Sequence, residues 1–184
     1  MGLDREQKDH VEEILASNKD YTDYKWIDPK KIVVSQWVRM KCRFGCGEYG
    51  HGGACPPETP SVAECREFFS EYSHGVILHF EGLMENPEDR HTWSARINNR
   101  LIKLERAVFT AGFERAFLMF MDSCCFCRDC TGSRTTCAQP RMARPSPEAM
   151  AVDVYTTVRQ AGFTINVLPD YDKKMDRFAF LMVH

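Results

Sequence analysis

Two groups of cysteines are the residues of this chain most suited to chemistry. The second group, "CCFCRDCTGSRTTC" at residues 124–137, holds five of the nine cysteines. Cysteine sulfur binds zinc, holds iron–sulfur clusters and forms disulfides, and each use favours its own spacing. Nine is an odd number, so the cysteines cannot all pair within the chain as disulfides. The spacing must distinguish the remaining uses.

Within the second group, Cys124, Cys127 and Cys130 form a C-x2-C-x2-C run, which Cys137 follows. This run is typical of ferredoxin-type [4Fe–4S] sites, because short spacers let one loop offer successive thiolates to different irons of a cubane. A structural zinc ion more often takes two cysteine pairs separated by a longer stretch. The group therefore predicts a [4Fe–4S] cluster held by these four cysteines, with zinc as the alternative.

The first group is Cys42-x3-Cys46-x8-Cys55, in a stretch from 41 to 57 that contains five glycines. The glycines predict an irregular loop. They also let the backbone pass close to a bulky inorganic group and turn amide N–H groups toward its sulfides. Three thiols around such a loop predict a second metal or cluster site, so the chain is expected to bind one [4Fe–4S] cluster and to have room for two.

The fourth ligand of the first group is open, with Cys65, Cys125 and His51 as candidates. Cys65 lies on the apolar face of an expected helix, which favours a place in the core. Cys125 lies between two ligand positions and is expected to point away from the cluster. His51 is flanked by glycine, where a histidine is usually solvated. If none of them completes the set, one iron stays open to water, a substrate or a partner, and the site would suit an enzyme.

The pattern of apolar residues predicts a single domain over residues 1–184, of the α/β or α+β class. One mixed sheet of about five strands is expected, with helices packed on it. The expected helices are 3–17, 60–72, 89–111 and one from 146–147 to 162. The expected strands are 31–38, 74–80, 115–121, 163–168 and 177–183, the last two forming a hairpin around "PDYDKK". Residues 1–28 form an N-terminal helix and extension. Each cysteine group would then be a loop directly after a strand, and the two loops would meet at one sheet edge.

Charge and hydropathy exclude several classes of partner. The chain has 24 basic and 26 acidic side chains and a net charge of −2, so no overall field attracts nucleic acid or anionic lipid. Apolar runs such as "AFLMFM" (116–121) are far too short to span a membrane. The first ten residues contain no apolar stretch, so no secretory signal is expected and the protein is predicted to be cytoplasmic. In a reducing cytoplasm, clustered cysteines favour metal or redox chemistry over disulfides.

Several stretches of the chain resemble a prokaryotic family of unknown function described as predicted metal-binding proteins. They are "WVRMKCRFGCGEYGHGGACPPETPS", "LERAVFTAGFERAF", "CCFCRDC" and "CAQPRMARPSPEAMAVDVYTTVRQAGF". The resemblance runs from about residue 30 onward and implies metal or iron–sulfur binding through the seven cysteines of the two groups. Family members are typical of anaerobes, which suits an oxygen-labile cluster. Where many relatives carry a further cysteine, this chain has Met150, so another residue must take any ligand role of that cysteine.

These observations predict a small iron–sulfur protein that transfers electrons to or from a partner protein. Two alternatives remain. One is an enzyme that uses an open-coordinated cluster as a Lewis acid or redox centre, and the other is an interaction module stapled by zinc. The sequence indicates neither a substrate nor an oligomeric state.

Overall fold

The computed structural model describes residues 2–83, 86, 89–168 and 174–184. In these residues, one four-stranded sheet has the order β1–β2–β4–β3, and each neighbouring pair of strands is antiparallel. The strands are β1 (Asp23–Ile27), β2 (Gly75–Gly82), β3 (Phe117–Met119) and β4 (Met175–Met182). The helices are α1 (Arg5–Ser17), α2 (Gln36–Gly45), α3 (Val62–Ser70), α4 (Asp89–Thr110), α5 (Val154–Gln160) and the short 3-10 helix η1 (Pro29–Lys31).

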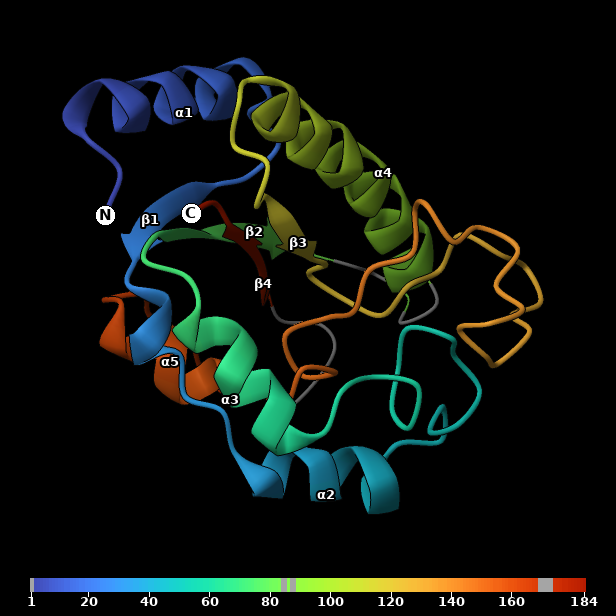
Figure 1. Cartoon of the computed structure of the whole chain (residues 1–184). Helices are drawn as coiled ribbons and strands as arrows, with labels where there is room; N and C mark the ends of the chain where they lie inside the picture. The colour runs from blue at the N-terminus through green and yellow to red at the C-terminus, as the bar shows by residue number, and fades with distance from the viewer. Residues whose placement is uncertain (1, 84–85, 87–88, 169–173) are drawn as a thin grey trace.

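Both faces of the sheet are covered, because successive side chains of a strand point to opposite sides. On β2, Val76, Leu78 and Phe80 face a core built with α1 and α4. Ile77, between them, joins a second core with residues of α3 and α5. Figure 1 shows α1 and α4 on one side of the sheet and α3 and α5 on the other. The protein is therefore an α+β fold with a buried sheet, as the sequence predicts.

The elements with the longest regular patterns are confirmed. The helices expected at 3–17 and 89–111 correspond to α1 and α4, and the strands expected at 74–80 and 177–183 correspond to β2 and β4. Gly112 ends α4 with a φ of +100°, a backbone conformation that glycine adopts without steric cost. The helix expected at 60–72 is α3, which Ser61 caps by accepting a hydrogen bond from the amide of Glu64 (3.3 Å). The strand expected at 115–121 is shorter, as β3.

The strand expected at 31–38 is wrong. The chain forms η1, a single bridge between Val34 and Val152, and then α2 from Gln36. The β-branched run ends at Val34, and the later apolar residues Trp37, Met40 and Phe44 recur at helical spacing. A short apolar run does not distinguish a strand from a helix by itself. The first cysteine group therefore starts inside a helix and not in a loop after a strand.

The strand expected at 163–168 is also wrong, and the sheet has four antiparallel strands in the described residues instead of about five in a mixed sheet. β4 pairs with β2 along its whole length, whereas β3 pairs only with residues 180–182 on its other edge. Residues 163–168 form no strand beside the rest of β4, and the carbonyl oxygen of Ile165 accepts a hydrogen bond from the side chain of Arg159 (2.9 Å). Most of the proposed turn, residues 169–173, lies outside the described residues. The remaining strand is β1, a short strand at the edge of the sheet. Its mixture of polar and apolar residues gives no clear strand pattern, so the sequence does not predict it.

The helix expected from 146–147 begins only at Val154. Ala151 has a φ of +59°, which breaks the helical path, and Asp153 caps α5 by accepting a hydrogen bond from the amide of Thr156 (3.0 Å). The chain from residue 120 to 153 thus contains no helix or strand apart from the Val34–Val152 bridge. This long irregular segment carries the second cysteine group.

Candidate metal centre

The first cysteine group lies at the end of α2 and in the loop that follows. Cys42 is in the last turn of α2 and Cys46 is the residue after it, so their spacing of four places both on one side of the helix end. The chain then turns through a glycine-rich segment that returns Cys55. Cys42, Cys46 and Cys55 all line one cavity of about 320 Å³.

The second group follows β3 and surrounds a larger, more open cavity of about 940 Å³. Cys124, Cys127 and Cys130 line it, and so does Cys55 from the first group. Cys137 does not line this cavity but lies close enough to Cys124 to raise the pKa of that thiol, to which burial makes the larger contribution. The four cysteines of the C-x2-C-x2-C run and its partner are therefore neighbours.

The two groups meet, as expected, although the first follows a helix. The amide of Gly53 donates a hydrogen bond to the sulfur of Cys130 at 3.5 Å. Glu58 accepts hydrogen bonds from the amide of Arg134 (2.7 Å) and the hydroxyl of Ser133 (3.2 Å), so it ties the same two loops together. Figure 1 shows both loops beyond the same end of α4. Cys55 belongs to both cavities and links the two thiol groups.

Burial raises the pKa of Cys42, Cys55 and Cys124 and so favours the protonated form of these three thiols. The pKa of Cys55 rises to about 11, first because burial disfavours the thiolate and then because the thiols of Cys42, Cys46, Cys124 and Cys130 lie nearby. A positive metal ion or cluster reverses this preference, because thiolates bind it and their protons leave. Such a group would remove the mutual repulsion of the closely placed thiolates.

The spacing of the sulfurs differs from that of a closed zinc site. Zinc–sulfur bonds of about 2.3 Å in a tetrahedron place sulfurs about 3.8 Å apart. In the described part of the chain, which includes all nine cysteines, no three sulfurs lie within 4.8 Å of one another. The group that does meet this limit is His79, Glu81 and Asp176, where His79 bonds Asp176 (2.8 Å) and Glu81 pairs with Lys174 (2.7 Å). We attribute that group to cross-strand pairing on β2 and β4.

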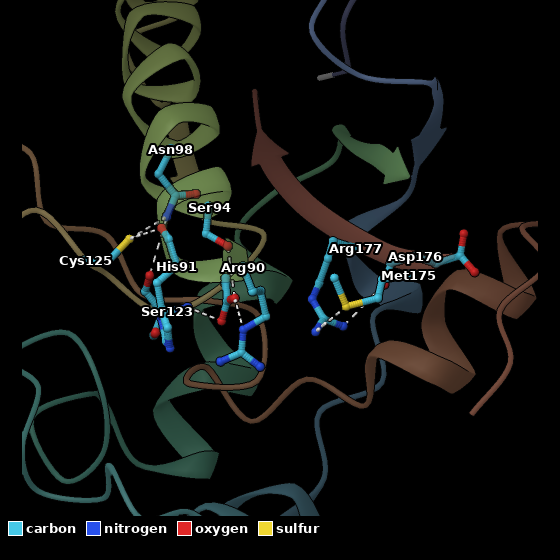
Figure 2. Close-up of polar contacts among 10 residues, drawn as sticks. Arg90, His91, Ser94, Asn98, Ser123, Cys125, Met175, Asp176 and Arg177 are labelled. Atoms are coloured by element: carbon cyan, nitrogen blue, oxygen red, sulfur yellow. Dashed lines mark hydrogen bonds and ion pairs between the residues drawn. The ribbon is translucent and has the colours of Figure 1, made fainter. Parts of the chain in front are cut away.

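The three candidates for an extra ligand lie in different surroundings. Cys65 is fully buried in the core beneath α3, and its sulfur lies 3.6 Å from the carbonyl of Pro60. Cys125 lines the larger cavity, with its sulfur 4.0 Å from both the Asn98 amide nitrogen and the His91 carbonyl oxygen, so it faces α4 (Figure 2). His51 is exposed and lines the same cavity. Met150 is buried in the core that also contains Cys65.

Other residues of the site carry no sequence signal. His91 and the pair Arg90 and Arg177 line the cavity of the first cysteine group, and His91 lines the larger cavity as well. They lie on α4 and β4, far from the cysteines in sequence. A single histidine or arginine in an ordinary helix or strand has no spacing that marks it, so only the folded chain identifies these residues.

The fold and site define an α+β protein with two adjoining cysteine loops, and thiols are the donors that soft metals and iron–sulfur clusters prefer. The chain belongs to the family of predicted metal-binding proteins DUF2284, whose model matches residues 25–183. No curated protein and no solved structure matches the chain. None of the helices in the described residues has the length and apolar character needed to cross a membrane.

Proposed function

We propose that this metal-binding protein is an iron–sulfur protein. Cys124, Cys127, Cys130 and Cys137 would hold one [4Fe–4S] cluster, and Cys42, Cys46 and Cys55 would provide three ligands to a second. The observation that carries the proposal is the meeting of six of these thiols, from segments far apart in the chain, around two cavities that share Cys55, with Cys137 near Cys124. The donor set fits such a cluster because it consists of thiols and because backbone glycines allow close approach.

Two features favour a cluster over a single zinc ion. No three sulfurs of the described residues lie within 4.8 Å of one another, whereas a tetrahedral zinc ion holds its sulfurs about 3.8 Å apart. The Gly53 amide also points at the sulfur of Cys130, and hydrogen bonds to cysteine sulfur are one of the means by which proteins set the potential of an iron–sulfur cluster. Zinc remains the alternative that metal analysis must exclude.

Electron transfer is the function that we assign to this centre. A bound [4Fe–4S] cluster supplies one-electron redox chemistry, with the electron coming from or going to a redox protein. The helix that carries Cys42 exposes Trp37 (45%), Met40 (43%) and Phe44 (74%), which gives a partner an apolar surface beside the first thiol group. We place the protein in the anoxic cytoplasm, where free thiols and an oxygen-labile cluster persist.

The first test is the content of iron, acid-labile sulfide and zinc after anoxic purification. About eight irons and eight sulfides per chain would support two clusters, and about four of each would support one. Anaerobic dithionite should bleach a broad visible absorption and produce a paramagnetic signal. A colourless protein with zinc and no sulfide would contradict the proposal and favour the zinc-stapled module.

Cysteine variants then assign the ligands. Cys127→Ser should lose about half of the iron of a two-cluster protein, and so should Cys46→Ser, because each removes a ligand of a different cluster. Phe44→Glu should retain the iron and slow electron exchange with the physiological redox partner. Unchanged iron in both serine variants would show that these thiols are not ligands.

A further inference from the structure

The cavity of the first cysteine group continues into a second space that no cysteine lines. This neighbouring cavity has a volume of about 400 Å³. Four residues line both spaces, namely Arg90, Met121, Glu148 and Arg177. The volume lies within the range of small-molecule sites in proteins. The guanidinium groups of Arg90 and Arg177 therefore lie at the boundary between the two cavities.

Arg90 is held in place by an ion pair with Asp122, and within the described residues its terminal nitrogens form no hydrogen bond. Its Nε lies 3.3 Å from Oδ2 of Asp122, yet this buried N–H has no aligned hydrogen-bond acceptor. Asp122 is itself fixed by Ser94, which donates to Oδ2 (3.0 Å), and by the amide of Ser123, which donates to Oδ1 (2.8 Å). Figure 2 shows the terminal nitrogens of Arg90 pointing away from these contacts.

Arg177 comes from the opposite side, on β4, and has even weaker partners. Its terminal nitrogens lie 3.5 Å from the carbonyl oxygen of Asp176 and 3.9 Å from the sulfur of Met175. Among the described residues, no carboxylate lies within 4.0 Å of Arg177. Figure 2 shows Arg90 and Arg177 projecting to the same side, between α4 and β4. Two poorly satisfied guanidinium groups at one cavity are a favourable arrangement for an oxyanion.

The acidic residues around the pocket do not cancel these charges completely. Asp122 pairs with Arg90 only through Nε (3.3 Å), which leaves the terminal nitrogens of Arg90 directed elsewhere, and Asp176 is engaged by His79 (2.8 Å). Burial raises the pKa of the Glu148 carboxyl and nearby Arg177 lowers it, so Glu148 offsets part of the charge of Arg177. Beyond the arginines the lining is mixed. Its apolar residues are Val154, Ile165, Val167, Leu168 and Phe178, and Tyr155 and Asn166 add polar groups to those of Glu148 and Asp176.

We propose that Arg90 and Arg177 bind the oxyanion of a small organic acid, a carboxylate or a phosphate monoester, whose hydrocarbon part contacts the apolar residues of the neighbouring pocket, such as Val154, Ile165 and Phe178. The oxyanion would lie beside Cys42, Cys46 and Cys55. The inference does not depend on which metal these thiols hold, and it would give the centre a substrate as well as a redox partner.

The test measures binding of four probes to the full chain, purified with its metal, by isothermal titration calorimetry. Hexanoate and hexyl phosphate represent the two oxyanions, hexanamide lacks the charge, and acetate lacks the apolar body. At least one of the two oxyanions should bind ten-fold or more tightly than hexanamide. Acetate should bind much more weakly than hexanoate, because each buried methylene contributes about four-fold in affinity. Equal binding of hexanamide and both oxyanions, or no binding of either oxyanion at millimolar concentration, would overturn the proposal.

Variants distinguish the arginines from direct ligation of the metal. Arg177→Gln and Arg90→Gln should each weaken oxyanion binding at least ten-fold, whereas Arg96→Gln, an exposed arginine on the same helix as Arg90, should not. Metal content and circular dichroism establish that each variant is folded. If Arg177→Gln retains full affinity, the arginines are not the binding site and the proposal fails. The iron–sulfur assignment would be untouched by that result, because it rests on metal analysis.

Discussion

The backbone amide of Gly53 donates a hydrogen bond to the sulfur of Cys130 at 3.5 Å, across 77 positions of the chain. This contact joins the two cysteine loops. Glu58 reinforces the junction through the amide of Arg134. The proposed metal centre therefore depends on close approach of two backbones as well as on its thiols.

Gly53→Ala should disrupt this junction. A β-carbon at residue 53 would lie 2.7 Å from the carbonyl oxygen of Ser133, so one of the loops must move. We expect a loss of about 1–3 kcal/mol in the free energy of unfolding, together with reduced metal content, measured by urea denaturation and metal analysis. Gly47→Ala is the matched control, since a β-carbon there meets nothing within 4 Å. Equal behaviour of the two variants would contradict the role given to Gly53.

Cys65→Ala should leave the metal content unchanged. Cys65 lies on the buried face of α3 and lines neither thiol cavity, so its truncation leaves a small void and should cost about 1 kcal/mol of stability. In the metal-free protein, iodoacetamide should modify exposed Cys46 rapidly and Cys65 only after unfolding, as peptide mass spectrometry would show. Loss of iron in Cys65→Ala would instead make Cys65 a ligand.

Glu105→Ala should be strongly destabilising. Glu105 is buried on α4, accepts a hydrogen bond from the amide of Leu118 (2.9 Å), and pairs with Arg144 (2.7 Å). Removing it leaves a partly buried guanidinium and a buried amide unpaired, for which we expect a loss of about 3–5 kcal/mol. Urea denaturation measures this loss. Asp9→Ala breaks only an exposed ion pair at 3.9 Å and should change the stability by less than about 0.5 kcal/mol. A small effect of Glu105→Ala would mean that the Glu105–Arg144 pair contributes little to stability.

Protonation of His74 should make the fold less stable in mild acid. Burial lowers the pKa of His74, nearby Lys8 and His184 lower it further, and Asp28 opposes them. Its neutral Nδ1 accepts a hydrogen bond from the amide of Leu3 (3.4 Å). Because the folded pKa lies below the unfolded value of about 6.5, the stabilisation is complete above that pH and is lost as the pH falls below it.

The expected loss is about 1 kcal/mol, the net contribution of one hydrogen bond. His74→Asn has no titrating group, so the difference in unfolding free energy between pH 7.5 and 5.5 should be smaller in this variant than in the wild type. Comparing the two proteins in the same buffers removes the contributions of all other groups. Identical pH profiles would show that His74 does not contribute.

The sequence by itself determined the parts of this protein that depend on local pattern. Thiol spacing is readable without a fold, so the cysteines indicate metal binding directly. α4 and β2 have apolar patterns long enough to outweigh local ambiguity. The same reasoning gave wrong predictions for short elements such as residues 31–38, because a few apolar residues fit a strand or a helix equally well.

Tertiary structure decided the features that depend on contacts between distant segments. Residues 163–168 form no strand beside β4, and the carbonyl oxygen of Ile165 bonds the side chain of Arg159 on α5 instead. The approach of Gly53 to Cys130 and the convergence of Arg90 and Arg177 likewise arise only when the sheet positions its connecting loops and α4. Periodicity reports which side of an element is buried, but it contains no information about which other element buries it.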